Sequence, residues 1–164
     1  MAASLDYVGK YIWRGRVVTD DPALQPGVTV GLDKLTFGVW GTIDTTNING
    51  DRNQFQEVDY TVDYTDALPD VEGVTYSVGA ILYEFPTTNG RTNATTEIYG
   101  GLGFDCILNP TVTLYYDMDD ADGFYGNVGV SHSLDISEYG LMEDMITSVD
   151  LAASLGYADR KFNQ

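Results

Sequence analysis

Acidic residues recur at alternate positions along several segments of this sequence, and two cationic residues follow the same alternation near the amino terminus. The set is Asp6, Lys10, Arg14, Glu57, Asp59, Asp63, Glu97, Asp105, Asp117 and Asp150. Carboxylates that surround an enclosed path favour the passage of cations, as rings of acidic side chains do in channels. Alternatively, Lys10 and Arg14 pair with some of the carboxylates and hold together a filled interior. The residues alone leave both interpretations open.

Other residue types that commonly carry chemistry are scarce. One His and one Cys are too few for a zinc site built on these ligands or for a disulfide. Residues 117–123 are rich in Asp but lack the spacing and the closing Glu of an EF-hand, so we expect an exposed acidic loop. No Ser-His-Asp set and no phosphate-binding loop occurs. We therefore expect no enzyme activity, no cofactor and no bound metal.

Composition narrows the class of protein further. A length of 164 residues fits one domain, and 8 Lys and Arg against 25 Asp and Glu give a net charge of −17. So acidic a chain could not neutralise a run of phosphates, which excludes a nucleic-acid partner. No run of about 18 apolar residues occurs, so no transmembrane helix is expected. The first residues carry neither a charged nor an apolar signal region, which leaves either a cytosolic chain or one cut from a longer precursor.

The elements that position the carboxylates are β-strands, because apolar and polar residues alternate along nearly the whole chain. In residues 57–65, for example, Val58, Tyr60, Val62 and Tyr64 alternate with acidic residues and threonines. The pattern predicts nine strands, at residues 5–16, 25–33, 35–44, 56–66, 73–85, 95–106, 110–119, 123–135 and 145–159. No helix is expected between them, so consecutive strands must pair antiparallel in an all-β, up-and-down meander.

The connections between these strands tend to alternate in length. Tight turns are expected at 33–34 and 107–110, moderate links at 68–73 and 137–144, and longer loops at 17–24, 45–55 and 86–94, with 119–123 a short exception. Short turns at one end of a sheet and longer loops at the other are typical of outer-membrane β-barrels.

Alternation does not decide which solvent meets the apolar face, but three features favour lipid. The polar face is built mainly of Gly, Thr, Ser and Asp, and each apolar stripe fits a strand of about 9–11 residues across hydrocarbon. Aromatic residues also gather near strand ends, where they could form interfacial girdles. These residues are Tyr11, Trp13, Tyr64, Phe85, Tyr116, Phe124 and Tyr157. A barrel in lipid must close and an odd number of strands needs a return strand, so we expect a fragment that lacks a signal peptide and at least one C-terminal strand.

Several motifs resemble those of one bacterial family. The runs GKYIWRG at 9–15, DPALQPG at 21–27 and FGVWG at 37–41 look like the opening of the TorF-like family of bacterial outer-membrane porins. EVDY at 57–60 and TEIY at 96–99 resemble later strands of that family in order and spacing, whereas Lys10 and Pro26 depart from its pattern. The resemblance implies an outer-membrane barrel of roughly ten to twelve strands with a channel role.

The sequence therefore predicts a transmembrane β-barrel of the bacterial outer membrane that passes small solutes or cations passively through an acidic lumen. Its expected partners are outer-membrane lipid and lipopolysaccharide, while its oligomeric state is left open. Two alternatives remain: a soluble or periplasmic β-barrel that binds an apolar ligand, and a structural or adhesive outer-membrane barrel with a filled lumen. Apolar side chains in the interior and aspartates pointing outward would exclude the leading prediction.

Overall fold

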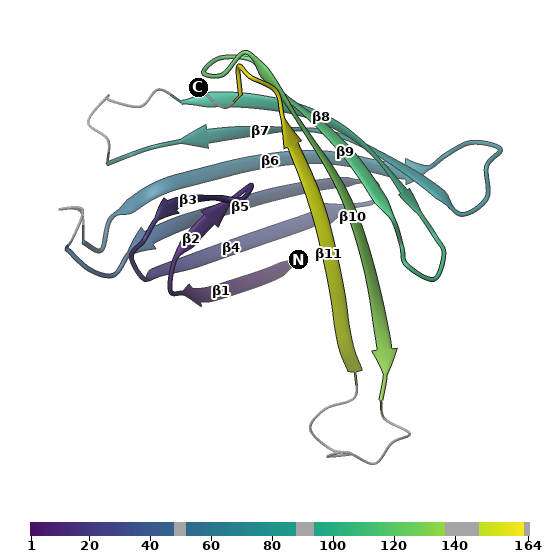
Figure 1. The fold of residues 1–164 in the computed structure, drawn as a ribbon, viewed down its shortest axis with the longest axis horizontal. Helices are drawn as coiled ribbons and strands as arrows, with labels where there is room; N and C mark the ends of the chain where they lie inside the picture. The colour runs from purple at the N-terminus through teal and green to yellow at the C-terminus, as the bar shows by residue number, and fades with distance from the viewer. Residues whose placement is uncertain (48–51, 88–93, 137–147, 163–164) are drawn as a thin grey trace.

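The alternating sequence builds one antiparallel sheet of nine strands (Figure 1). The computed structural model describes residues 1–47, 52–87, 94–136 and 148–162. The strands of the sheet are β1 (Ala2–Val8), β4 (Ala23–Leu32), β5 (Leu35–Asp44), β6 (Phe55–Ala67), β7 (Val74–Glu84), β8 (Thr95–Phe104), β9 (Thr111–Asp117), β10 (Gly123–Asp135) and β11 (Ser148–Ala158). They pair in chain order, β1-β4-β5-β6-β7-β8-β9-β10-β11, so the predicted all-β antiparallel meander is confirmed. The described residues contain no helix with the length and hydropathy needed to cross a membrane.

The two faces of the sheet differ in polarity and in exposure. Large apolar side chains point to one face and are exposed there; the exposed fraction is 53% for Leu114 and 78% for Leu155. Carboxylates point to the other face and are enclosed, with Glu97 0% and Asp117 5% exposed. The cross-strand register keeps this alternation in phase, since Glu97 on β8 lies opposite Asp117 on β9. The enclosed face of the sheet is therefore the polar one, and we call it the inner face.

The sheet is open. Among the described residues, β1 pairs only with β4 and β11 only with β10, so each carries one unpaired edge. Figure 1 shows the strands twisting around the inner face, with β10 and β11 extending beyond their neighbours. The meander expected from the sequence is therefore present, whereas its closure into a barrel is not seen in the part of the chain that the structure describes.

Turns at one end of the sheet are compact. Asp33 and Lys34 join β4 to β5, and the links 68–73 and 105–110 join β6 to β7 and β8 to β9. Left-handed φ angles at Asp33 (57°), Asp70 (63°) and Asn109 (39°) fit Asp and Asn, which adopt this conformation more readily than most residues. The expected loops at 45–55, 86–94 and 137–144 lie partly or wholly outside the described residues.

The prediction of one strand over residues 5–16 is wrong. The first strand ends at Val8, and a short hairpin follows, formed by β2 (Tyr11–Trp13) and β3 (Arg16–Thr19). The expected loop at 17–24 instead holds most of β3 and the start of β4. Alternation could not reveal the hairpin, because a two-residue turn at Arg14 and Gly15 leaves the period-two pattern almost intact on both sides.

Glycine on the inner face makes room for tyrosine rings. Gly79 on β7 lies opposite Tyr99 on β8, and the Tyr99 hydroxyl donates a hydrogen bond of 2.7 Å to Asp63 Oδ2 on β6. A Cβ atom at Gly79 would lie 2.4 Å from Tyr99 Cζ and 2.6 Å from the Val62 carbonyl oxygen. The Tyr99 ring therefore crosses over Gly79 to reach Asp63.

We expect the substitution Gly79→Ala to lower the free energy of unfolding by about 1–3 kcal/mol, because the added methyl displaces the Tyr99 ring. Urea unfolding followed by circular dichroism measures the change. The matched control is Gly31→Ala on β4, where an added Cβ meets no atom within 4 Å. Alanine is preferred to glycine in a strand, so the control should lose no stability; equal effects of the two substitutions would contradict the packing account.

Candidate functional site

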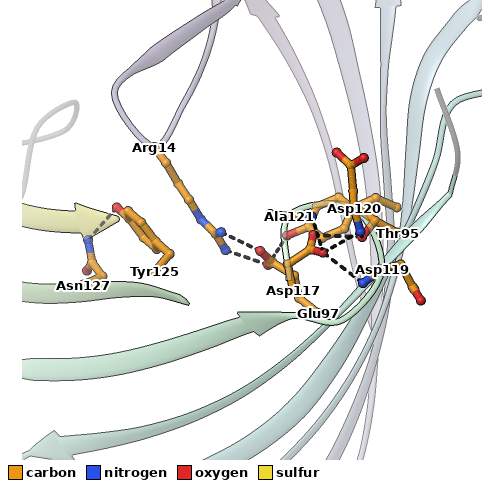
Figure 2. A network of polar contacts seen from close by, with 10 residues as sticks. Arg14, Thr95, Glu97, Asp117, Asp119, Asp120, Ala121, Tyr125 and Asn127 are labelled. Carbon is orange, nitrogen blue, oxygen red and sulfur yellow. Dashed lines mark hydrogen bonds and ion pairs between the residues drawn. The ribbon is translucent and has the colours of Figure 1, made fainter. Parts of the chain in front are cut away.

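The β2–β3 hairpin places Arg14 on the inner face. Arg14 and Gly15 form its two-residue turn, with φ angles of 48° and 79° in the left-handed region. Two left-handed residues define a type I′ turn, whose twist matches that of a hairpin, and glycine adopts this conformation without steric cost. The turn leaves Arg14 at the tip, and Figure 2 shows its side chain extending toward Glu97 on β8.

Arg14 and Glu97 form an ion pair enclosed by the protein. Arg14 Nη1 and Nη2 donate hydrogen bonds of 2.6 and 2.7 Å to the two carboxylate oxygens of Glu97. The Tyr83 hydroxyl on β7 donates a third bond of 2.8 Å to Glu97 Oε2. A planar guanidinium matches a carboxylate in this bidentate geometry, and such charge-assisted bonds are stronger than neutral ones. The pair therefore fastens the hairpin tip to the sheet.

Aromatic rings surround the same guanidinium. Its central carbon lies 4.3 Å from the centre of the Trp13 ring, 4.4 Å from Tyr115, 4.3 Å from Tyr125 and 5.1 Å from Phe162. A cation within about 6 Å of an aromatic face is attracted by the ring quadrupole, and more strongly where water is excluded. The inner face thus holds one cation with a carboxylate and four rings.

Phe162 reaches this cluster from the turn after β11. Its backbone N–H donates a hydrogen bond of 2.8 Å to Asp159 Oδ1, which lowers the pKa of that carboxyl. Lys161 forms an ion pair of 2.6 Å with Asp122, in the link between β9 and β10. These contacts orient the Phe162 ring, which stacks on Trp13 with centres 5.8 Å apart. The end of β11 and the early hairpin therefore meet over the inner face.

A second group of polar atoms lies beside this pair, on β5 and β6. The Tyr11 hydroxyl donates to Glu57 Oε1 at 3.3 Å, and burial raises the pKa of the Tyr11 phenol, which keeps its proton. The Glu57 carboxyl group also contacts that of Asp59 through a hydrogen bond. Thr42 lies opposite Glu57 in the β5–β6 pairing. Thr42 Oγ1 and Asp59 Oδ1 are buried and have no hydrogen-bond partner in the described part of the chain.

Asp117 has a structural role at the end of β9. Its Oδ1 accepts hydrogen bonds from the backbone N–H groups of Asp119, Asp120 and Ala121 at 3.1, 2.9 and 3.0 Å. Its Oδ2 accepts a bond of 2.8 Å from the Thr95 hydroxyl, and Figure 2 shows these contacts together. Asp117 thus shapes the acidic link to β10, in which Asp119 and Asp120 are exposed, as expected for this loop.

Two of the cavities on the inner face are lined by residues of the hairpin. The first has a volume of about 390 Å³ and is lined by Tyr11, Trp13, Arg16, Val17, Val18, Glu57, Tyr83, Phe85, Thr95, Glu97, Asp117, Asp120, Ala121 and Phe162. The second has a volume of about 540 Å³ and is lined by Arg14, Gly15, Tyr115, Tyr125, Asn127, Ser154 and Gly156. They share no lining residue, and neighbouring residues of the hairpin, Trp13 and Arg14, line one each. The hairpin therefore divides the space over the inner face.

The structure brings together half of the predicted charged residues. Arg14, Glu57, Asp59, Glu97 and Asp117 lie within or beside the first cavity and its ion pair. Asp63 lies further along the same face of β6 and binds Tyr99.

The other predicted charged residues are exposed and lie apart from this cluster. Lys10 pairs with Asp20 near the base of the hairpin. Asp6 and Asp150 lie on the edge strands β1 and β11, and Asp105 lies in the β8–β9 turn. Residues that point to the same face of the sheet by alternation therefore need not share a site.

Three of the predicted interfacial aromatics lie elsewhere. Tyr64, Tyr116, Phe124 and Tyr157 do lie on the outer face, at the same alternate positions as its apolar side chains. The placement of Tyr11, Trp13 and Phe85 is wrong, because all three line the first cavity. For Tyr11 and Trp13 the cause is the hairpin, which turns their strand onto the inner face.

Five further residues were missed by the sequence pattern. Tyr83, Tyr115 and Tyr125 share the alternation of the carboxylates, and this signal could have placed them on the inner face. Thr42 carries the same signal on β5. Phe162 carries none, because it follows the last strand and its position depends on the contacts of Asp159 and Lys161.

Comparison with known proteins identifies one family. A family model described as "Bacterial protein of unknown function (Gcw_chp)" matches residues 1–164. No curated protein matches the sequence, and no solved structure matches the fold.

Proposed function

The chain belongs to the Gcw_chp family of bacterial proteins of unknown function, and we propose that it acts as an outer-membrane β-barrel that passes small solutes, preferentially cations, through an acidic interior. The resemblance of residues 9–15 and 21–27 to TorF-like porins supports this proposal.

The observation that carries the proposal is the inverted polarity of the sheet. Leucine side chains such as Leu114 and Leu155 are exposed on one face, while Glu97 and Asp117 are buried on the other. In water this arrangement exposes a large apolar surface, which soluble monomers rarely do. In a bilayer the outer face meets hydrocarbon and the polar residues face the lumen, as in known membrane barrels. Tyr116 and Phe124, which pack on each other near strand ends, suit the headgroup level.

Closure is part of the proposal. The backbone groups at the free edges of β1 and β11 would lack hydrogen-bond partners in hydrocarbon, at several kcal/mol each. In a meander of nine strands the first and last run in the same direction. An all-antiparallel barrel therefore needs an odd number of further strands between these two edges, which gives ten or more in total.

The interior explains the preference for cations. Glu57, Glu97, Asp117 and Asp120 line the first cavity with Arg16 as the only basic side chain among its described lining residues. A lumen with an excess of carboxylates concentrates cations and repels anions. It also disfavours the soluble alternative with an apolar ligand, because the enclosed face carries charge.

A second candidate is a barrel with a filled lumen, acting through its surface. The bidentate pair between Arg14 and Glu97 favours it, because this pair holds the hairpin across the inner face. This candidate predicts the same insertion into membranes but no ion flow.

Conductance decides between the two candidates. The full chain, inserted in a planar bilayer under a KCl gradient, should give discrete current steps with a reversal potential on the cation side. Neutralising two inner carboxylates, in the variant Glu57→Gln with Asp59→Asn, should move the reversal potential toward zero. Asp66→Asn is the control, because Asp66 lies near the C-terminal end of β6, at an outer-face position, and pairs with Lys34. Inserted protein without steps would favour the filled barrel, and anion preference would contradict an acidic path.

A further inference from the structure

We propose that the second cavity binds an uncharged, polyhydroxylated solute such as a sugar, held by the Arg14 guanidinium and by neutral polar side chains of β9, β10 and β11. The inference rests on the proposed function only for the route by which the solute reaches the inner face, because binding itself needs no ion flow.

The second cavity differs from the first in its charge. Its described lining residues include no carboxylate, and Arg14 is the one charged side chain among them. The carboxylate of Glu97 binds Arg14 through both oxygens and offsets its charge. A neighbouring cavity of about 270 Å³, which shares Ser154, is also lined by uncharged residues in the described part of the chain. An ion of either sign would leave water without gaining an unpaired opposite charge, whereas a neutral solute needs none.

Neutral hydrogen-bonding groups line this cavity from three adjacent strands: Tyr115 on β9, Tyr125 and Asn127 on β10, and Ser154 on β11. A hydroxyl group both donates and accepts hydrogen bonds, and an amide offers two N–H groups and one carbonyl oxygen. Arg14 adds donors, because a guanidinium has five N–H groups and Glu97 accepts from two of them. The hydroxyl groups of a sugar are likewise both donors and acceptors, so they match this mixed set of partners.

These groups retain hydrogen-bonding capacity for a solute. The Asn127 amide donates to the Tyr125 hydroxyl at 3.5 Å, a long contact that leaves its carbonyl oxygen and one N–H group. Tyr115 contacts the rings of Tyr99 and Tyr125 and the guanidinium of Arg14. Within the described residues, no hydrogen bond of the Tyr115 hydroxyl is found. Tyr115 and Asn127 are half-buried, so a solute in the cavity can reach both side chains.

The wall of the cavity is ordered by contacts within the protein. Gly156 on β11 lies opposite Asn127 on β10, and a Cβ atom at Gly156 would clash with the Tyr125 hydroxyl. Glycine therefore gives the Tyr125 ring its place, and the Arg14 guanidinium lies 4.3 Å from the centre of that ring. Figure 2 shows Tyr125 and Asn127 on the side of Arg14 away from Glu97. A preorganised wall reduces the entropy lost on binding.

The size and the mixed character of the wall also fit a sugar. The volume of about 540 Å³ lies in the range of sites for small organic molecules. A tyrosine side chain combines an apolar ring with a polar hydroxyl, and a sugar combines C–H groups with hydroxyls in the same way. A wholly apolar ligand would instead remove water from Asn127 and Ser154 without replacing its hydrogen bonds.

A saturation-transfer NMR titration of the full chain in detergent tests the inference with three ring molecules: glucose, glucuronate and cyclohexanol. We expect glucose to bind at least about tenfold more tightly than cyclohexanol, which has a single hydroxyl group. Glucuronate should bind at least about fivefold more weakly than glucose, because its carboxylate would lie near that of Glu97 in a chain of net charge −17. Equal binding of glucose and cyclohexanol, or tighter binding of glucuronate, would overturn the inference.

Variants locate the binding site. Tyr115→Phe removes one hydroxyl but keeps the ring beside Arg14, and it should weaken glucose binding by about two- to tenfold. Asn127→Ala should weaken glucose binding by at least about as much, and it tests the same wall if Tyr115→Phe does not fold. Tyr60→Phe is the matched control, because Tyr60 is exposed on the outer face of β6, and it should bind as the unmodified chain does. Unchanged affinity in folded Tyr115→Phe or Asn127→Ala would overturn the site.

The proposed channel and this sugar site can fail separately, because glucose binding is measured in detergent and ion flow in a planar bilayer. Glucose binding without current steps would refute the channel alone. Current steps without glucose binding would refute the sugar site alone.

Discussion

Substituting Arg14 by methionine is expected to lower the free energy of unfolding by about 3–5 kcal/mol, because it leaves the carboxylate of Glu97 buried without its cation. Glu97 is 0% exposed and accepts two of its bonds, at 2.6 and 2.7 Å, from Arg14. Among the residues that the structure describes, the Tyr83 hydroxyl would then be the remaining donor to Glu97. The substitution also removes the contacts of the guanidinium with the rings of Trp13 and three other aromatic residues. Urea unfolding in detergent or lipid vesicles, followed by tryptophan fluorescence, measures the loss.

The matched control is Lys34→Met, which breaks an ion pair of similar length in an exposed place. Lys34 binds Asp66 at 2.7 Å, but its side chain is 46% exposed. Exposed pairs contribute only about 0–1 kcal/mol, so little change is expected. Adding Glu97→Gln to Arg14→Met should restore part of the stability, since the buried charge is then removed. A loss in Arg14→Met no larger than that in Lys34→Met would contradict the anchoring role of this pair.

Substituting Leu114 by arginine is expected to lower the free energy of unfolding in lipid vesicles by about 2–4 kcal/mol, because the charge would face the middle of the bilayer. Leu114 lies on the outer face of β9 and is 53% exposed. In a soluble protein an exposed leucine tolerates arginine within about 0.5 kcal/mol. An outer face in hydrocarbon and an outer face in water therefore predict different effects of Leu114→Arg on the free energy of unfolding.

Leu108→Arg provides the control for depth. Leu108 is 50% exposed, close to the value for Leu114, but it lies in the turn between β8 and β9. A charge near the membrane interface costs only about 0–1 kcal/mol. The same vesicle unfolding assay compares the two variants. If Leu114→Arg were as stable as Leu108→Arg, the outer face would not lie in hydrocarbon.

The strands could be predicted from the sequence because period-two alternation is a local property. Val58, Tyr60 and Val62 alternate with Glu57, Asp59 and Thr61, and the pairing of β6 with β5 keeps this phase up to a register shift between Thr42 and Ile43. A one-residue slip would exchange the faces of a strand, so the pattern also determines the register. For this reason the inner-face positions of Glu57, Asp59, Glu97 and Asp117 followed from the sequence.

Alternation could not show which of these residues share a site. Asp6 and Asp150 have the correct parity but lie on the free edges, and Asp105 lies in a turn. The distance along a strand and the order of strands in the sheet separate them from Glu97. Alternation shows only which face a side chain points to, and it specifies neither of these quantities.

The sequence by itself determined the antiparallel meander and the polarity of its two faces, because each strand carries its own alternation. Only the tertiary structure decided that residues 11–19 fold back over the inner face, where Arg14 meets Glu97 across 83 positions of the chain. It also decided that Phe162 closes the cluster from the other end of the chain. The hairpin is not visible in the sequence because a two-residue turn preserves the local alternation. The surroundings of Arg14 are not visible either, because its carboxylate and its aromatic rings come from distant parts of the chain that only folding brings together.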